Sequence, residues 1–205
     1  AVCEAVGADV NDVALGMGYD KRIGNEFLRP GPGFGGSCFP KDTNALIKIA
    51  EDAGYDFRLL KGVVEVNAEQ FDRVVRKVVD AAGGSVEGVK IGAWGITFKA
   101  RTDDTRESPA IEIIHRLQAL GAEVSAYDPA IGSDIEGITV GADPYAVCEG
   151  AEVLVVLTEW DEFKWLDVDK MTEVMAKRRI VDARNLLDRT RFRQAGFTYE
   201  GIGRL

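Results

Sequence analysis

The stretch Val89-Lys90-Ile91-Gly92-Ala93-Trp94 decides the fold, because here the chain changes from purely helical patterns to strands that alternate with helices. The break Gly83-Gly84-Ser85 precedes it, and Ser108-Pro109, a pair typical of a helix start, follows it. The stretch is therefore predicted to be the first strand of a new structural unit.

The same alternation continues to the end of the chain. Further strands are predicted at residues 123–127, 153–157, 179–181 and 197–199. The helices predicted between and beside them are residues 108–120, 143–149, 169–177 and 186–194. This pattern predicts an α/β fold with a Rossmann-like, doubly wound parallel sheet over residues 88–205. Ligands of such sheets bind at the carboxyl ends of the strands, beside a topological switch point.

Residues 1–87 are predicted to form a central helical region. Helices are expected from Asp9 or Asn11 through Met17, over residues 42–53, and from Phe57 to Ala82. The apolar residues of the longest helix recur at helical spacing, and it carries no catalytic residue type at a telling position. That stripe is more typical of packing or of a dimer surface than of a ligand site.

The composition excludes several classes of function. A net charge of −9 and a pI near 4.8 argue against nucleic acid as a partner. No apolar run approaches the length of a membrane span, and no signal peptide opens the chain. The three cysteines lack metal-ligand spacing, so we expect no metal site, no disulfide framework and a reducing compartment, the cytoplasm. Residues 1–6 resemble the middle of an amphipathic helix, which predicts that the chain is part of a longer protein.

One loop of the helical region carries the clearest chemical signal. In Gly31-Pro32-Gly33-Phe34-Gly35-Gly36-Ser37-Cys38-Phe39-Pro40-Lys41-Asp42, a thiol follows a glycine-rich loop and precedes a predicted helix start. The positive end of the helix dipole favours a thiolate there, so Cys38 is a candidate nucleophile. The alternative is a small buried residue beside a turn. Cys3 and Cys148 lie in helix-like segments and are expected to be inert.

The second half offers candidate phosphate contacts. Lys99, Arg101 and Arg106 follow the first strand, and Arg184 follows a later one, where cations suit phosphate groups. A solvated loop is the alternative for the first three. Gly92-x-x-Gly95 is a weak nucleotide signal, because the full glycine fingerprint is missing. Asp128 ends a strand where a ribose-binding acid would lie, although a turn fits equally well. The single histidine, His115, is expected to be an ordinary helix residue and not a general base.

Taken together, several motifs resemble the UDP-glucose 6-dehydrogenase family. They are Gly33 to Asp42, Asp20-Lys21-Arg22-Ile23-Gly24 leading to Phe27-Leu28, Phe98-Lys99, Asp104-Thr105-Arg106-Glu107-Ser108, and Thr158-Glu159-Trp160. The resemblance covers essentially all 205 residues. It implies NAD as cofactor, UDP-glucose and UDP-glucuronate as substrate and product, and a homodimer formed through the helix from Phe57 to Ala82.

The resemblance also implies roles for single residues. Cys38 would attack an aldehyde intermediate as a thiolate, passing through a thiohemiacetal and a thioester, and Asp42 would support the water and base chemistry. Arg106 would contact the NAD pyrophosphate, and Arg22 would reach the substrate of a neighbouring subunit. The other residues implied to bind the nucleotide sugar are Phe27, Leu28, Gly31, Gly33, Phe34, Gly35, Gly36, Phe98, Lys99 and Arg184.

The departure from the family pattern is large. Against that pattern, the chain is expected to lack the family's amino-terminal NAD-binding domain, together with the catalytic lysine and asparagine that precede this segment. We therefore expect the chain alone to bind the nucleotide sugar but to be inactive. GDP-mannose or UDP-N-acetylmannosamine dehydrogenase, or a non-catalytic module for nucleotide-sugar binding or dimerisation, are the alternatives.

Overall fold

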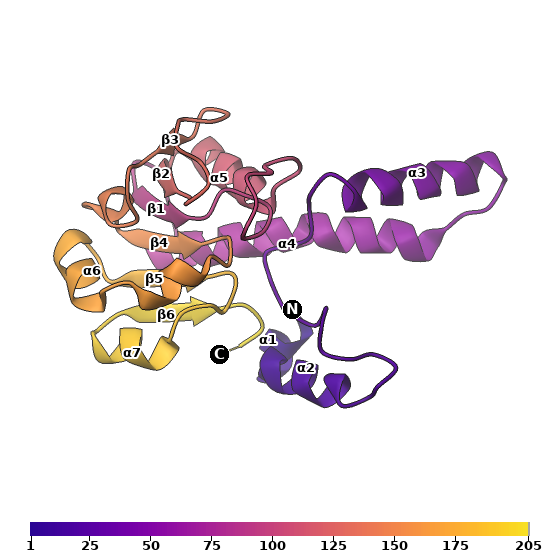
Figure 1. Ribbon diagram of the computed structural model, residues 1–205, viewed down its shortest axis with the longest axis horizontal. Coiled ribbons are helices and arrows are strands. Elements are labelled where there is room, and N and C mark those ends of the chain that lie inside the picture. The colour runs from indigo at the N-terminus through magenta and orange to yellow at the C-terminus, as the bar shows by residue number, and fades with distance from the viewer. Residues whose placement is uncertain (205) are drawn as a thin grey trace.

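The computed structural model describes residues 1–204 and contains a helical part followed by an alternating α/β part (Figure 1). Its helices are α1 (Val2–Val6), α2 (Val10–Gly18), α3 (Phe39–Asp52), α4 (Arg58–Ala82), α5 (Pro109–Ala119), α6 (Val168–Val174) and α7 (Arg189–Gln194). Its strands are β1 (Lys90–Trp94), β2 (Glu123–Tyr127), β3 (Thr139–Val140), β4 (Val153–Val156), β5 (Arg179–Asp182) and β6 (Thr198–Gly201). Two short 3-10 helices complete it, η1 (Ala146–Cys148) and η2 (Asp161–Trp165). None of the described helices is both long and apolar enough to span a membrane.

All six strands are parallel and lie in the order β3-β2-β1-β4-β5-β6. The chain proceeds outward from β1 through β2 to β3, returns to β4 on the other side of β1, and proceeds outward again. The order therefore reverses between β1 and β4, which makes their carboxyl ends the topological switch point. The predicted doubly wound parallel sheet is confirmed.

Each face of the sheet has its own apolar core. Along β4, Val153 and Val155 join one core, whereas Leu154 and Val156 join the other. The first core also receives residues of α4 and α5, and the second receives residues of η1, α6 and α7. Since both faces are covered, this central strand is apolar at every position instead of at alternate ones.

Helix α4 links the helical part to the sheet. Three valines near its carboxyl end, Val74, Val75 and Val78, are buried in the first core. Its amino-terminal half extends beyond the sheet, and α3 packs back along it (Figure 1). The position of the segment that precedes α4 is thus determined by how α4 lies on the sheet.

Polar contacts join the start of the described chain to its end. The Val10 amide donates to the Gly203 carbonyl at 2.8 Å, and the Gly203 amide donates to Glu4 Oε1 at 2.8 Å. Lys77 of α4 lies between Glu4 and Glu200, at 3.0 and 2.8 Å. Burial opposes the Lys77 charge, but the two carboxylates outweigh it, so the pKa of Lys77 is raised. These contacts hold α1 and α2 against β6 and α4.

Several element boundaries differ from the prediction. Helix α3 begins at Phe39, earlier than expected, because Pro40 is tolerated in a first helical turn. Cys38 thereby becomes the N-cap residue. Helix α7 begins at Arg189 because the Asp188 side chain accepts hydrogen bonds from the first turn. The two-residue β3 and the 3-10 helix η2 were not predicted, since segments this short have no periodicity.

The buried Asp128 organises the carboxyl edge of the sheet. Its Oδ2 accepts hydrogen bonds from the Ile96 amide at 2.8 Å, the Thr97 amide at 3.0 Å, the Thr97 hydroxyl at 2.9 Å and Trp160 Nε1 at 3.0 Å. Its Oδ1 accepts one from the Ala130 amide at 2.9 Å. The carboxylate thus joins the loops that follow β1, β2 and β4. Of the two interpretations, the structure supports the turn, because both oxygens are already engaged.

We expect Asp128→Asn to destabilise the chain by about 2–4 kcal/mol, because hydrogen bonds to a charged acceptor are worth about 1.5–3 kcal/mol and the amide cannot replace both oxygens. Urea unfolding measures this change. Asp103→Asn, at an exposed position of the loop after β1, is the matched control and should change stability by less than about 0.5 kcal/mol. A loss below about 1 kcal/mol for Asp128→Asn would contradict the role assigned to this carboxylate.

Candidate active site

The candidate site lies at the switch point between β1 and β4. The loop after β1 runs to Ser108, the N-cap of α5, whose hydroxyl donates to the Ile96 carbonyl at 2.6 Å. The Thr158 hydroxyl, after β4, donates to the Thr97 carbonyl at 2.7 Å. Both hydroxyls are buried, so the two loops are fixed to each other where the sheet ends. This is the edge at which the sequence placed its candidate residues.

The glycine-rich loop lies against the loop after β1. The Gly36 amide donates to the Glu107 carbonyl at 3.4 Å, and the Phe98 ring lies against Gly36. A Cβ atom on Gly35 would lie only 2.0 Å from the same Glu107 oxygen. Glu107 itself has a φ of 49°, a conformation that costs energy outside glycine and is common at functional sites. The structure therefore brings the predicted Gly35, Gly36 and Phe98 together.

Cys38 is exposed at the amino terminus of the 14-residue helix α3. Its carbonyl accepts the first helical hydrogen bond, from the Asp42 amide at 2.8 Å. The Ser37 hydroxyl lies 3.7 Å from the Cys38 sulfur, within hydrogen-bonding range for sulfur. Asp42 lies one turn into the helix, and its carboxylate forms an exposed ion pair with Lys41 at 3.4 Å. The thiol thus has the accessibility that a nucleophile requires.

Arg184 reaches the site from the loop after β5. Its Nε donates to the Leu157 carbonyl at 2.8 Å, and its Nη2 to the Phe98 carbonyl at 3.4 Å. The Glu159 carboxylate lies 3.1 Å from Nε. Burial lowers the pKa of Arg184, and the Glu159 and Asp182 carboxylates oppose that shift. Nη1 lies next to Gly31, so this one side chain contacts three loops of the site.

Two further cations border the site. Arg106 is exposed and binds Asp104 through both guanidinium and backbone nitrogens. The Arg106 hydrogen bonds lower the pKa of Asp104 to about 2. The Lys99 ammonium lies 5.1 Å from the centre of the Phe98 ring and is exposed. Both cations are available to an anionic ligand from the solvent side.

A cavity of about 660 Å³ opens at this edge. Its cationic side chains come from four different segments, and Glu159 is one of its acids. The cations are Arg29, Arg101, Lys164 and Arg184. Asp161, the other acid of the lining, binds Arg101 at 2.9 Å and Lys164 at 2.8 Å. Four cations against two acids still leave an excess of positive charge, which favours an anionic ligand on a chain with a net charge of −9.

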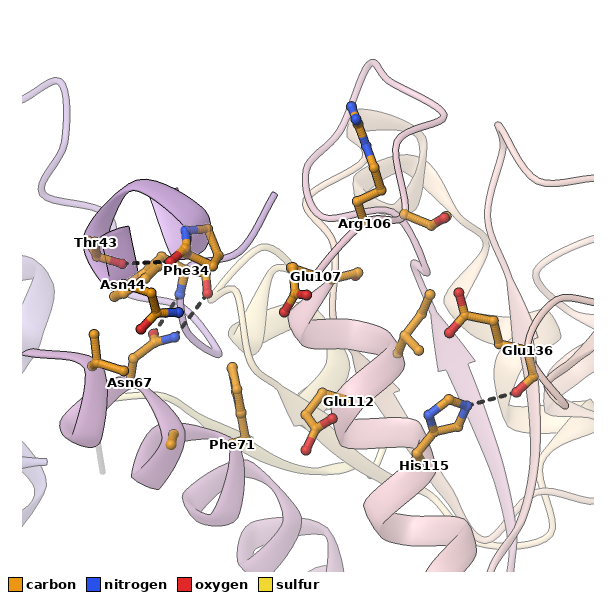
Figure 2. A pocket seen from close by; sticks show the side chains of 16 residues that line it. Phe34, Thr43, Asn44, Asn67, Phe71, Arg106, Glu107, Glu112, His115 and Glu136 are labelled. Carbon is orange, nitrogen blue, oxygen red and sulfur yellow. Dashed lines mark hydrogen bonds between the residues drawn. The ribbon is translucent and has the colours of Figure 1, made fainter. Parts of the chain in front are cut away.

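A second cavity of about 480 Å³ lies between α3, α4 and α5 (Figure 2). His115 borders it, with Nε2 2.8 Å from the Glu136 carbonyl, and Figure 2 shows the ring turned toward that oxygen. Arg106 points away from the cavity in the same view. His115 is thus a half-buried helix residue with a backbone partner, as predicted.

The structure does not bring every predicted residue together. Phe27 is 95% exposed, and the Arg22 side chain is 88% exposed and binds Asp20. Neither contacts Cys38, Phe98 or Arg184. Leu28, in the same connection between α2 and α3, is half-buried. Cys148 is buried, and burial raises the pKa of its thiol above the usual range, which makes it inert as predicted.

Sequence reasoning missed the side chains that hold the glycine-rich loop. Asn67 and Gln70 of α4 bind its backbone at Phe34 and Gly31, and the Phe71 ring lies against Gly33. The signal was present, since two amide side chains three residues apart interrupt an otherwise apolar stripe. It was interpreted only as packing or as a dimer surface.

Comparison with known proteins gives a consistent result. Models of the UDP-glucose/GDP-mannose dehydrogenase family match residues 1–69, as its central domain, and residues 92–189, as its UDP binding domain. A UDP-glucose 6-dehydrogenase of Rhizobium meliloti is 47% identical over 207 residues, which cover 99% of this chain and 47% of that protein. The chain therefore spans about half the length of the curated relatives it matches.

Solved structures agree. A UDP-glucose dehydrogenase from Pyrobaculum islandicum superposes with a TM-score of 0.82 at 33% identity, covering 98% of this chain and 45% of that one. An NDP-N-acetyl-D-galactosaminuronic acid dehydrogenase from Methanosarcina mazei Go1 superposes with a TM-score of 0.89 at 28% identity, covering 99% of this chain and 46% of that one.

The packing of the glycine-rich loop predicts that two Gly→Ala substitutions change the free energy of unfolding in opposite directions. Gly35→Ala should destabilise the chain by about 2–4 kcal/mol, because its Cβ cannot coexist with the Glu107 carbonyl unless the loop moves. Gly16→Ala, within α2 and with open space around it, should stabilise the chain by up to about 1 kcal/mol. Urea unfolding of both variants tests this. Equal effects of the same sign would contradict the close contact at Gly35.

Proposed function

Because the chain belongs to the UDP-glucose/GDP-mannose dehydrogenase family, we propose that it forms the nucleotide-sugar-binding half of a NAD-dependent UDP-glucose 6-dehydrogenase. One observation carries the proposal. The exposed Cys38 thiol follows a loop that contacts Phe98 and Arg184, two residues of the cation-lined carboxyl edge of the sheet. A reactive thiol and a site for a phosphate-bearing ligand therefore share one loop.

The cationic cavity fits the diphosphate of the nucleotide. Arg184 is held by carbonyl oxygens and by Glu159, so its position needs little reordering when a ligand binds. Lys99, on the same loop as the lining residues Ala100 and Arg101, adds a mobile point charge, whereas a guanidinium can bind two phosphate oxygens at once. The sugar would then extend from the cavity toward Gly36 and Cys38.

The described residues fit only part of an NAD molecule. Asp128, where a dinucleotide-binding sheet has its ribose-binding acid, is fully engaged by five donors, so this sheet does not fit a complete dinucleotide. The exposed Arg106 guanidinium fits a pyrophosphate at the edge of the site. NAD, when bound, supplies the hydride acceptor for both oxidations.

The chemistry assigned to this chain centres on Cys38. The sulfur attacks the carbonyl carbon of the aldehyde formed by the first oxidation, which creates a C–S bond and places the electron pair on oxygen. Oxidation of this thiohemiacetal leaves a thioester on Cys38. Water then breaks the C–S bond, which releases the carboxylate of UDP-glucuronate and regenerates the thiol. Asp42, one helical turn from the sulfur, would orient that water or accept its proton.

Substrate protection tests this function. UDP-glucose at about ten times its Kd should slow alkylation of Cys38 by iodoacetamide about ten-fold, because only the unbound fraction reacts. GDP-mannose at the same concentration should not protect. Lys99→Ala should weaken UDP-glucose binding about ten-fold through loss of a charge-assisted phosphate contact.

Lys90→Ala, at the opposite end of β1, is the matched control for Lys99→Ala and should bind normally. Calorimetry measures the affinities, and peptide mass spectrometry measures the alkylation rates with Cys3 as internal reference. Equal, ligand-independent labelling of Cys38 and Cys3 would contradict a nucleophilic site and favour a non-catalytic binding module. Protection by GDP-mannose alone would assign the chain to another substrate of the family.

The proposal includes a homodimer. An apolar face on the outer part of α3 and α4 is exposed, with relative exposures of 43% to 76%, and a cavity of about 630 Å³ opens on α4. Its residues are Leu46, Ile49, Leu59, Val63 and Val66. Contiguous apolar surface of this kind is typical of subunit interfaces. The high exposure of Arg22 and Phe27 accords with a role at the site of a second subunit.

Sedimentation velocity tests the dimer. The chain should sediment at about twice its mass of 22.3 kDa, and Leu59→Glu should shift it to the monomer, because a buried, unpaired carboxylate opposes association. Leu120→Glu, at the end of α5, is the control because it replaces a leucine of 51% exposure away from this face. A wild-type chain that remains monomeric at every concentration would contradict the dimer.

A further inference from the structure

The Asn67 side chain of α4 forms two hydrogen bonds with the backbone of the glycine-rich loop, as a neighbouring β-strand would. Asn67 Oδ1 accepts a hydrogen bond from the Phe34 amide at 2.8 Å, and Asn67 Nδ2 donates one to the Phe34 carbonyl at 3.0 Å. Figure 2 shows the Asn67 amide turned toward the Phe34 backbone, with both bonds drawn. The residue must therefore offer one donor and one acceptor in a single plane, which is the chemistry of an amide.

Two neighbours on the same face of α4 complete the attachment. Gln70 Nε2 donates to the Gly31 carbonyl at 2.9 Å. The Phe71 ring lies 2.5 Å from the position that a Cβ atom on Gly33 would take. Residues 67, 70 and 71 have the spacing of a single helical face. This face thus contacts three of the four residues 31–34, namely Gly31, Gly33 and Phe34.

The same helix is anchored in the sheet. Val74 and Val78, one and two turns after Gln70, are 0% exposed in the core that covers the sheet. At its other end, the loop meets Glu107 and Phe98 of the switch point. The loop is therefore held from both sides within the frame of the sheet, and Cys38 follows two residues after Gly36.

We propose that Asn67 is a positioning residue for the Cys38 thiol. Its two hydrogen bonds to Phe34 determine the path of residues 34–37 and thereby where the sulfur lies relative to a ligand in the cationic cavity. That the position of the thiol matters for catalysis rests on the proposed function. That Asn67 holds the loop before Cys38 rests on the observed contacts alone. The cations proposed to bind the phosphates, Lys99 and Arg184, lie on other elements, and Arg184 is held through the Leu157 and Phe98 carbonyls. Loss of the Asn67 bonds should therefore displace the thiol more than it weakens phosphate binding.

If Asn67 positions the thiol, its loss should affect the position of the Cys38 sulfur more than the affinity for the nucleotide sugar. A displacement of about 1 Å at a reacting atom can cost about a hundred-fold in rate, even when the cause lies away from the chemistry. Loss of the Asn67 bonds should therefore leave nucleotide-sugar affinity nearly unchanged, while the sulfur no longer lies beside the bound sugar.

The test uses Asn67→Ala and the isosteric Asn67→Asp in the complete 205-residue chain. In both variants, UDP-glucose should bind with a Kd within about three-fold of wild type, while its protection of Cys38 against iodoacetamide falls from about ten-fold to below about three-fold. Amide hydrogen exchange at Gly36 and Cys38 should accelerate by about ten-fold, more in Asn67→Ala than in Asn67→Asp, which retains the acceptor for the Phe34 amide. Glu69→Ala, at an exposed position of α4, is the control and should change none of these.

Unchanged protection and unchanged exchange in a folded Asn67 variant would overturn the proposal. If Asn67→Ala does not fold, Asn67→Asp and Gln70→Ala give the same two measurements. A wild-type chain that does not bind UDP-glucose would refute the proposed function instead, and the exchange at Gly36 and Cys38 would still decide whether Asn67 positions the loop.

Discussion

The packing of the carboxyl-terminal part of α4 on the parallel sheet is the contact on which the remaining structure depends. The 25-residue helix is fixed in direction because Val74, Val75 and Val78 are buried in the core of the sheet. Its amino-terminal part extends beyond the sheet (Figure 1). The part beyond the sheet supports α3, and the junction between the two parts carries Asn67, Gln70 and Phe71. A glycine-rich loop has little structure of its own, since its residues lose more conformational freedom on folding than others do. Its shape is therefore imposed by the helix on one side and by the switch-point loops on the other.

Two buried carboxylates have a similar organising role at the carboxyl edge of the sheet. Asp128 follows β2, and Asp182 ends β5, where it accepts hydrogen bonds from the amides of Arg184, Leu186 and Leu187 and from the Tyr199 hydroxyl. Burial raises the pKa of Asp182, and the four donors offset part of that cost. Removing water from a carboxylate is expensive, so such a group persists where many backbone donors need an acceptor at once. At both positions, the carboxylate organises loops that lead to a cation at this edge, Lys99 after β1 and Arg184 after β5.

The parts of this architecture that repeat along the chain could be predicted from the sequence. Strand and helix alternation predicts the sheet, and the rule that ligands bind at the carboxyl ends of strands predicts Lys99, Arg101 and Arg184 at one edge. The contacts that depend on three-dimensional proximity could not be predicted. Asn67 and Phe34 are 33 residues apart, and no local pattern reveals that an amide on a helix will pair with a loop backbone. The start of α3 was misplaced for a related reason, because the helix signal of Lys41 and Asp42 lies inside the first turn, whereas Cys38 serves as N-cap without a side-chain hydrogen bond.

Electrostatics explains why this edge suits an anion although the chain as a whole is acidic. The net charge of −9 is spread over the surface, where solvent and salt screen each charge within about 10 Å. Arg184 is different, because it is held in a largely desolvated position in which its interactions are screened much less. Glu159 lies beside it and offsets part of the cost of burying a cation without closing the cavity that both residues line. A ligand with two negative charges would therefore meet a positive local potential on a molecule whose net charge is negative. The cations are already held in place by the folded sheet, so binding need not order them.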